Sequence, residues 1–365
     1  MKSPTYILVG IYTLLGQAAA VGVVGTAPGF AASTTGGGTA TPQYPADITE
    51  LTTWLTDSTA RVIALNKEFN FIGSEGTATE TGCRPASNTC PDNGGQDAIN
   101  QADWCTNGNA GTGATSIQVT YDKAGITPIN VGSNKSLIGI GSTGVIRGKG
   151  LRIANGAKNV IIQNIHITEL NPQYIWGGDA ITVAGSDLVW VDHCKVSLVG
   201  RQMFVAGTTA SNRVTLSNTE FDGVTNWSAT CDGHHYWGVY LTGSSDLVTM
   251  KGNYIHHTSG RVVRLLRPRL RHRRRGYVVA EGNVFQDVVT PLLENKGSLF
   301  SSPSTSANTA CAADLGHNCQ LNTYGNSGAF DGSDTGFFSD FSGQTVASAD
   351  AASTSISSSA GVGVI

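Results

Sequence analysis

The chain has 365 residues and a formal charge of −3, and only 13% of its residues are charged, against about 25% in ordinary soluble proteins. Gly occurs 46 times, well above the roughly 7% that is usual, so turns must be frequent. Half of the arginines, seven of fourteen, fall between Arg264 and Arg275. The composition therefore excludes a basic surface for nucleic acid elsewhere in the chain, and it excludes a protein built mainly of exposed charged helices.

The N-terminal residues have the pattern of a secretory signal peptide. Lys2 precedes an apolar stretch from Tyr6 to Gly16, and the small residues at 18–20 predict cleavage near Ala20. The apolar stretch is too short to span a bilayer, although a retained membrane anchor is the alternative. We expect a secreted, extracellular protein with no membrane partner, in which the seven cysteines form disulfides and leave one free thiol. Two acceptor sequons predict N-glycosylation at Asn134 and Asn226.

A β-rich segment recurs through the middle of the chain. Copies begin at Val160, Val189, Val214 and Val248, at spacings of 29, 25 and 34 residues, and a further copy begins at Tyr277. Apolar residues at this spacing, with Gly, Asn and Asp between copies, predict stacked coils of a solenoid, because no single copy can bury its apolar face alone. The unequal spacings place extra residues in loops on one side. A sandwich or a barrel is the alternative.

The repeats share a polar residue at nearly one position, which predicts a stacked side-chain ladder at one corner: Asn164, His193, Asn218, Asn253 and Asn283. No linker interrupts residues 21–341, so we expect a single domain there. Residues 342–365, rich in Ser, Ala and Thr, are expected to form a loose or O-glycosylated tail.

Two short motifs have an alternative functional reading. The glycines from Gly139 to Gly144 match the G-x-G-x-x-G pattern of nucleotide-binding loops, but strand-like residues without helical periodicity follow, so a turn between two strands is favoured. His234 and His235 have no further ligand at metal-binding spacing, so we expect a turn in which the imidazoles form local hydrogen bonds.

The run from Trp176 to Arg261 carries the chemistry. It contains WGGDAITVAGSDLVWVDHCKVSLVGRQ, then DGHHYWGVYL, then SGR, and it resembles the fungal pectin lyases of polysaccharide lyase family one. The resemblance extends over about residues 20–345, except 262–275. It implies an all-β, right-handed parallel β-helix and metal-independent β-eliminative cleavage of methyl-esterified galacturonan. It also implies the disulfides Cys83–Cys105, Cys90–Cys231 and Cys311–Cys319. Cys194 is then left as a buried and inert thiol.

The resemblance assigns catalytic roles to Asp179, Arg201 and Arg261. Pectate lyases, the calcium-dependent relatives, place acidic residues on two neighbouring coils. This chain has Asp179 on the first coil but Gly200-Arg201-Gln202 on the second. One carboxylate cannot hold a hard cation that needs several oxygens, so we expect Arg201 to replace the metal and Asp179 to orient it. Arg261 matches the base of the family, and no metal or other cofactor is expected.

Aromatic residues match the substrate-binding cleft of the family, at Trp176, Trp237 and Tyr240. Sugars present C–H faces that stack on such rings, although ordinary core packing of the tryptophans is the alternative. The segment from Cys83 to Cys90 contains no tryptophan where the family usually has one, so weaker affinity is expected at that end of the cleft. The expected partner is plant cell-wall pectin, bound by a monomer.

Other functions were weighed against a pectin lyase. A polygalacturonase on the same scaffold needs two positioned carboxylic acids, but Asp179 is followed by Ala180. A calcium-dependent pectate lyase would need the missing acidic residues. A non-catalytic pectin-binding β-helix is the third alternative.

Residues 262–275 have no counterpart in the family. The run R-P-R-L-R-H-R-R-R can be encoded so that a shift of one nucleotide gives G-H-A-F-D-I-G-A-G, which is similar to the G-H-A-F-E-I-G of the family. Only one repeat interval separates Asn253 from Asn283, where the family has a further coil. We expect a frameshifted or mis-spliced reading frame that has lost about one coil behind Arg261.

Overall fold

The computed structural model describes residues 21–91, 95–207, 209–243, 245–265, 276–295, 297–341 and 356–365. The predicted signal peptide and residues 266–275 of the arginine-rich segment lie outside the described residues. Across the described ranges, no helix has the length and apolarity needed to cross a membrane.

Ten strands form one long sheet, and only its last pair, β26 with β28, is antiparallel. In spatial order the strands are β1 (Pro42–Gln43), β2 (Arg61–Leu65), β8 (Lys135–Gly139), β11 (Lys158–Gln163), β15 (Asp187–Asp192), β18 (Arg213–Ser217), β21 (Leu247–Lys251), β23 (Tyr277–Glu281), β26 (Ser298–Ser301) and β28 (Gly332–Ser333).

A second, 14-stranded sheet forms the other two faces, which join through the long strand β22. One arm contains β3 (Glu68–Asn70), β9 (Val145–Arg147), β12 (His166–Leu170), β16 (Lys195–Val199) and β19 (Glu220–Asp222). The other arm contains β20 (His235–Leu241), β17 (Phe204–Ala206), β14 (Ile181–Ala184), β10 (Leu151–Ala154) and β7 (Ile129–Asn130). Between them lie β22 (Tyr254–Leu265), β24 (Val284–Val288), β25 (Leu292–Asn295) and β27 (Thr323–Gly325).

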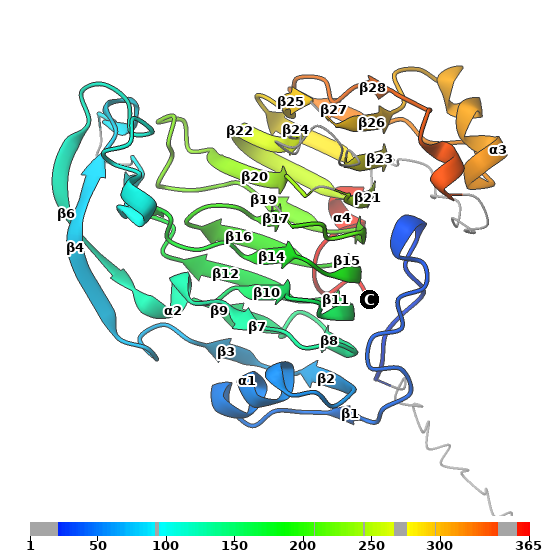
Figure 1. Ribbon diagram of the computed structural model, residues 1–365, viewed down its shortest axis with the longest axis horizontal. Helices are drawn as coiled ribbons and strands as arrows, with labels where there is room; N and C mark the ends of the chain where they lie inside the picture. Colours follow the sequence, from blue (N-terminus) through cyan, green and yellow to red (C-terminus); the bar gives the residue numbers. More distant parts are fainter. Residues whose placement is uncertain are drawn as a thin grey trace, which may run out of the picture.

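Each coil contributes one strand to each face, as β14, β15 and β16 do in turn, and the coils stack in parallel (Figure 1). The repeat valines of the sequence are direct partners in this stack: Val160 pairs with Val189, Val189 with Val214, Val214 with Val248, and Val248 with Val278. All five are at most 1% exposed, and burying one such side chain contributes about 1.5–3 kcal/mol. The predicted parallel β-helix is thus confirmed, and a sandwich or barrel is excluded.

The predicted polar ladder consists of two adjacent columns, so the expectation of one column is wrong. Asn164, His193 and Asn218 occupy a left-handed corner position, with φ between 46° and 58°. Gly252 and Gly282 continue that column with φ of 64° and 63°, because this backbone region favours Gly and Asn.

Asn253 and Asn283 lie one residue further on, in a second and buried column that continues to Asn322. The Nδ2 of Asn253 donates to Oδ1 of Asn283 at 2.8 Å, and Nδ2 of Asn283 donates to Oδ1 of Asn322 at 2.9 Å. The chain of amides satisfies polar groups that would otherwise be unpaired inside the turn.

A helix covers the N-terminal end of the solenoid. Helix α1 (Ile48–Thr56) is capped at its N-terminus by Asp47, whose carboxylate accepts hydrogen bonds from the backbone N–H of Thr49 and Glu50. Its Leu51 and Leu55 are fully buried and belong to the main core, so α1 closes the first coil.

Segments from both ends of the chain pack on the outer surface of the coils. Phe30, in the short helix η1 (Gly29–Ala31), is 1% exposed, and its N–H donates to Oγ1 of Thr249. The last ten residues begin with α4 (Ile356–Ser359), and the N–H of Gly361 donates to the carbonyl of Asn218 at the ladder corner. Residues 356–365 therefore differ from the loose tail that was expected, whereas residues 342–355 lie outside the described ranges.

A small third sheet projects from one side of the coils and holds the longest insertion, seen on the left of Figure 1. It contains β13 (Tyr174–Ile175), β5 (Asp97–Ala98), β4 (Thr77–Arg84) and β6 (Thr115–Asp122), followed by α2 (Lys123–Ile126). The remaining short helices are η2 (Ala86–Asn88), η3 (Gln101–Asp103), η4 (Ala307–Cys311), α3 (Ala312–Leu315) and η5 (Phe338–Phe341).

The structure contains the three disulfides that the family resemblance implied: Cys83–Cys105, Cys90–Cys231 and Cys311–Cys319. Cys194 is free and buried, and burial raises the pKa of its thiol to about 12, which makes it inert as expected. The glycine-rich segment Gly139–Gly144 ends β8 and contains the turn to β9, also as expected. Asn134 and Asn226 are both exposed, and their glycosylation stays a prediction.

Candidate active site

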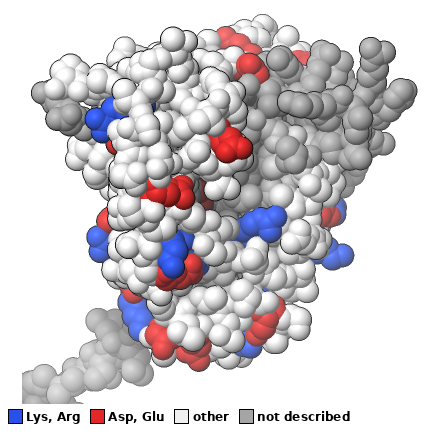
Figure 2. All heavy atoms as spheres, turned by 60° about the vertical axis from the view of Figure 1, so that its left-hand side comes forward, with Lys and Arg blue, Asp and Glu red and all other residues white. Residues whose placement is uncertain are grey.

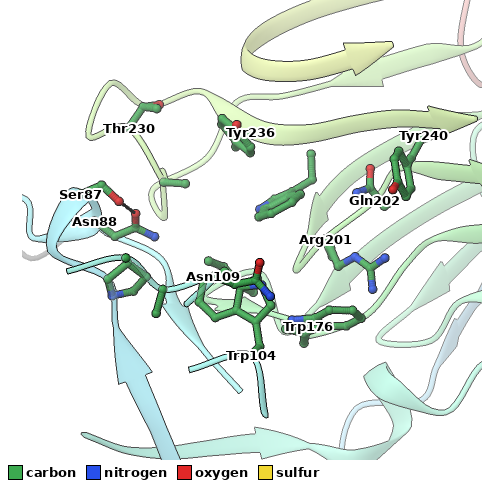
Figure 3. A pocket seen from close by; sticks show the side chains of 16 residues that line it. Ser87, Asn88, Trp104, Asn109, Trp176, Arg201, Gln202, Thr230, Tyr236 and Tyr240 are labelled. Atoms are coloured by element: carbon green, nitrogen blue, oxygen red, sulfur yellow. Dashed lines mark hydrogen bonds between the residues drawn. The ribbon is translucent and has the colours of Figure 1, made fainter. Parts of the chain in front are cut away.

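A cleft of about 570 Å³ lies between the coils and the inserted third sheet (Figure 3). Its size is typical of small-ligand sites. Its walls come from the segment after β4, the turn before β17, the loop after β19 and the strand β20. The residues that line it are Pro85, Ser87, Asn88, Trp104, Asn109, Ala110, Gly111, Ile175, Trp176, Arg201, Gln202, Ala229, Thr230, Tyr236, Trp237 and Tyr240. Four predicted site residues, Trp176, Arg201, Trp237 and Tyr240, thus line one cavity.

Arg201 lies in a turn whose backbone is held on several sides. Its N–H donates to the carbonyl of Gly178 on the preceding coil, and the N–H of Gln202 donates to Oδ1 of Asp179 at 2.9 Å. The carbonyl of Arg201 accepts a hydrogen bond from Nε2 of His235 at 2.7 Å. A carbonyl can only accept, so Nε2 of His235 must carry the proton. These hydrogen bonds fix the backbone of the turn, and therefore the position of the Arg201 Cα from which the side chain extends.

The guanidinium of Arg201 lies over the ring of Trp176, with 3.8 Å from Cζ to the ring centroid (Figure 3). This is a close cation–π contact, and a planar guanidinium is suited to it. The Arg201 side chain is 17% exposed. Trp176 itself has φ of 69°, a left-handed conformation that is rare for a bulky residue and often occurs at functional sites.

Asp179 lies beside Arg201 but makes no hydrogen bond to it in the described structure. The Nε of Arg201 is 3.6 Å from Oδ1 of Asp179. Burial raises the pKa of Asp179, against the opposing effects of Arg201 and of the N–H of Gln202. The two predicted partners are therefore neighbours, and the guanidinium also stacks on Trp176.

Trp237 forms a buried part of the cleft wall. It is 7% exposed, its ring packs edge-on against Tyr236 at 4.9 Å, and its Nε1 donates to Oε1 of Gln96 at 3.1 Å. Tyr240, two residues after Gly238 on the same strand, also lines the cavity.

Arg261 belongs to β22, and its backbone is paired with Trp237 of β20, next to the cleft. The side chain of Arg261 lies outside the described part of the structure, so its role stays a prediction. The preceding Gly260 packs on Tyr236, because a Cβ at Gly260 would lie 2.2 Å from ring atoms of that tyrosine.

Sequence reasoning missed Trp104, which lines the cleft together with Pro85. The segment from Cys83 to Cys90 contains no tryptophan, but the disulfide Cys83–Cys105 brings Trp104 next to it. Trp104 thus supplies an aromatic ring at this end of the cleft, and the weaker affinity expected there stays a prediction. The predicted disulfide was the signal that could have indicated Trp104.

The two adjacent histidines differ in their hydrogen bonds, because His234 bonds within its own turn and His235 bonds to another coil. Nδ1 of His234 is 2.7 Å from the carbonyl of Asp232, as expected for a local turn. His235 instead contacts Arg201 on another coil, and burial lowers its pKa to about 4, so its imidazole is neutral near pH 7. The expectation that both bonds are local is wrong for His235.

Among the described residues, two groups have the composition of a metal site: Glu281, His317 and Cys319, and Glu220, Asp222 and His256. Cys319 is in a disulfide, and the Nζ of Lys195 is 2.9 Å from a carboxylate oxygen of both Glu220 and Asp222. Neither group includes Asp179.

The fold and the cleft together define a parallel β-helix protein with an arginine and aromatic rings beside its central coils. Residues 1–264 match the family described as Pectate lyase, and the chain belongs to this family. It is 53% identical to pectin lyase B of Emericella nidulans, over 97% of this chain and 98% of that protein. It is 52% identical to a probable pectin lyase A of Aspergillus clavatus over the full length of both, and 54% identical to a pectin lyase of Colletotrichum gloeosporioides over 90% of each.

Solved structures share the fold at low sequence identity. A pectate lyase from Acidovorax avenae subsp. citrulli has a TM-score of 0.56 at 15% identity and covers 98% of this chain and 99% of its own. A pectate lyase bound to a hexasaccharide has a TM-score of 0.53 at 15% identity, over 95% of this chain and 99% of that one.

Proposed function

We propose that this protein is a secreted pectin lyase that cleaves methyl-esterified (1→4)-α-D-galacturonan by β-elimination, without a metal, and gives 4,5-unsaturated oligosaccharides. The observation that carries the proposal is the guanidinium of Arg201, held over Trp176 beside the single carboxylate of Asp179. The relatives that are named pectin lyases at 52–54% identity support it.

The reaction needs a positive group at the uronyl carboxyl of the substrate. When a base removes the C5 proton, negative charge develops on that carboxyl group as the C4–O bond breaks. A preorganised cation or hydrogen-bond donor stabilises this charge. A methyl ester is neutral before the reaction, so an arginine suffices where a free carboxylate would need a divalent ion.

The donor set around Arg201 does not suit calcium. Calcium takes six to eight oxygen ligands, whereas Asp179 is the only carboxylate among the residues that this account assigns to catalysis. The carboxylate of Asp179 already accepts the N–H of Gln202. The fixed positive charge of Arg201 occupies the position next to it.

The cleft suits an uncharged polymer. Trp104, Trp176, Tyr236 and Tyr240 present rings to it, and sugar C–H faces stack on such rings. Charged side chains are sparse and of mixed sign on the side of the molecule shown in Figure 2. Methyl-esterified galacturonan carries little charge, so neither a basic groove nor a row of metals is required to bind it.

Arg261 is proposed as the base. The pKa of an arginine lies far above neutral, so the proposed role requires a site that disfavours the charged form of the guanidinium. A second cation and partial burial act in that direction. The backbone of Arg261 pairs with Trp237 in the strand next to the cleft wall, which is consistent with this role.

The remaining parts of the proposal concern where and how the protein works. Plant cell-wall pectin is extracellular, so we propose that the enzyme is secreted. We also propose that it acts as a monomer, with no nucleic acid or membrane partner.

Ultraviolet absorbance of the product tests the reaction type. A lyase gives an absorbing unsaturated product, a hydrolase gives reducing ends without that absorbance, and a pectin-binding protein without catalysis gives neither.

A further inference from the structure

Gln96 lies behind the cleft wall and does not line the cavity. It immediately precedes β5 in the inserted third sheet and is 1% exposed. Its backbone N–H donates to the carbonyl of Ser228, and its own carbonyl accepts from Nδ2 of Asn88 at 2.6 Å. The residue therefore connects the inserted sheet with the loop after β19.

The side chain of Gln96 connects two parts of the cleft that come from different coils. Its Oε1 accepts the Nε1–H of Trp237 at 3.1 Å. Its Nε2 donates to the carbonyl of Gly200 at 2.7 Å and to the carbonyl of Pro172 at 3.0 Å. Gly200 directly precedes Arg201.

The partners determine the orientation of the amide without ambiguity. The indole N–H of Trp237 can only donate, so the atom that faces it must be oxygen. The carbonyls of Gly200 and Pro172 can only accept, so the atom that faces them must carry two hydrogens. Only an amide offers one acceptor and two donors in this arrangement, and a glutamate would place a carboxylate against two carbonyl oxygens.

We infer that Gln96 is a positioning residue that fixes the distance between the Trp237 ring and the turn carrying Arg201. The inference rests on the proposed function, because that distance sets the width available to a sugar between the wall and the guanidinium. Small displacements of such groups lower both binding and turnover. Gln96 has no contact with substrate in this account and acts through the two groups that it joins.

Gln163 offers a matched control in the same chain. It is also 1% exposed and also makes three side-chain hydrogen bonds, to the N–H and carbonyl of Val24 and to Asp192, but on β11. Gln163→Met and Gln96→Met therefore remove the same kind of buried amide at two places. We expect both variants to have lower thermal unfolding midpoints than the unchanged protein.

The two variants are expected to differ in binding. Titration of the full chain with a methyl-esterified oligogalacturonide, followed by calorimetry, should show about tenfold weaker affinity for Gln96→Met and unchanged affinity for Gln163→Met. Gln96→Glu should bind at least as weakly, because it keeps the shape but not the two donors. Turnover on pectin should fall in the Gln96 variants alone.

The indole N–H of Trp237 gives a readout that does not depend on ligand. Its hydrogen exchange should accelerate in Gln96→Met, with the signal assigned from its loss in Trp237→Phe. Faster exchange with unchanged affinity and turnover would overturn the positioning role and leave a structural one, and unchanged exchange would overturn the contact itself. If the unchanged protein binds no galacturonan, the proposed function fails first, and this inference fails with it.

Discussion

At the scale of single residues, Arg201 combines a fixed backbone with a guanidinium stacked on an aromatic ring. The carbonyl of Arg201 is held by His235, and its guanidinium lies 3.8 Å from the Trp176 centroid. Lysine has the same charge but lacks the planar group that lies flat on an indole. The charge is thus presented in one orientation, which is the requirement for stabilising a developing carboxyl charge.

The first prediction concerns the two arginines assigned to the chemistry. Arg201→Ala and Arg261→Lys should each lower turnover on methyl-esterified pectin at least about a hundredfold, because each removes a charge-stabilising or proton-transfer group. Initial rates measure the effect, and circular dichroism should stay unchanged. Arg201→Lys keeps the charge without the stacking, so its rate should lie between that of the unchanged protein and that of Arg201→Ala. If Arg261→Lys retained most of its turnover, the assignment of the base would have to be abandoned.

The sequence indicates residues whose predicted role follows from a local motif. It does not indicate residues whose role depends on contacts between distant segments of the chain. The motif at Arg201 predicts that this side chain takes the place of the metal, and this role stays a prediction. The motif could not indicate Gln96, because the contact with Trp237 joins residues 141 positions apart through an insertion outside the repeat. Trp104 was missed for a related reason, since a disulfide and not its own segment places it in the cleft.

At the scale of elements, the second prediction concerns the buried amide column. Asn283→Ala removes the Oδ1 that accepts both the backbone N–H and Nδ2 of Asn253, and it removes one of the two donors to Oδ1 of Asn322, inside a turn where water does not reach them. We expect a loss of at least about 2 kcal/mol in the free energy of unfolding, since each unpaired buried group costs about 1–3 kcal/mol. Asn130→Ala, at an exposed strand position, should change it by less than about 0.5 kcal/mol. Denaturant unfolding of the two variants compares them directly, and equal losses would contradict the role of the column.

The sequence predicted that these asparagines stack, but not that they form two columns. Residue type alone does not reveal the offset, because Asn and Gly both suit the left-handed corner position while Asn also suits the buried position beside it. The offset follows from the strand register, which places Ser217 opposite Lys251 and so aligns Asn218 with Gly252.

The third prediction concerns stability against pH. Burial lowers the pKa of His166 and of His235 to about 4, whereas the unfolded value is about 6.5. Between these values the unfolded chain binds protons that the folded chain does not, so stability falls as pH drops from about 6.5 to about 4. Asp246 has the opposite effect on stability. Burial raises its pKa to about 6, so below that pH the folded state binds a proton that the unfolded state does not, and stability rises as pH falls. On the alkaline side, Glu281 raises the pKa of His317, so the stability from this pair is present below about 6.5 and is lost as pH rises through the raised pKa.

The thermal unfolding midpoint should therefore be highest near pH 6.5. His166→Asn should reduce the loss on the acid side, Asp246→Asn should increase it, and His317→Gln should reduce the loss on the alkaline side. An acid-side slope that is the same in His166→Asn as in the unchanged protein would contradict the assignment.

The fourth prediction concerns the arginine-rich segment. The family match ends at residue 264, directly behind Arg261. This end point supports our proposal that a frameshift or mis-splicing event has replaced about one coil by residues 262–275. Seven cations in the wall of a β-helix would be costly without acidic partners.

Sequencing of the transcript across Arg261 to Gly276 tests this proposal. We expect a reading frame that restores a segment of the type G-H-A-F, and we expect higher lyase activity from the restored protein. A transcript that encodes the arginine-rich peptide in frame would refute it.

At the scale of the whole molecule, the repeat pattern predicts stacked coils, and the family resemblance was needed to specify a parallel β-helix instead of a sandwich or a barrel. The four valines at unequal spacings of 29, 25 and 34 residues are direct neighbours in the stack. The longest of these intervals holds the loop after β19, which contributes Ala229 and Thr230 to the cleft. The insertions place the site on one side of a regular core, but their own structure follows no repeat and could not be predicted in the same way.

The central claim, the fifth prediction, is that a fixed arginine takes the place of a metal in this β-helix. It is tested most directly by the rate of unsaturated product formation in excess chelator, on highly methyl-esterified pectin and on polygalacturonate. We predict that the rate on esterified pectin is unchanged by chelator and by added calcium, and that it exceeds the rate on polygalacturonate. Loss of activity in chelator, restored by calcium, would contradict the role assigned to Arg201.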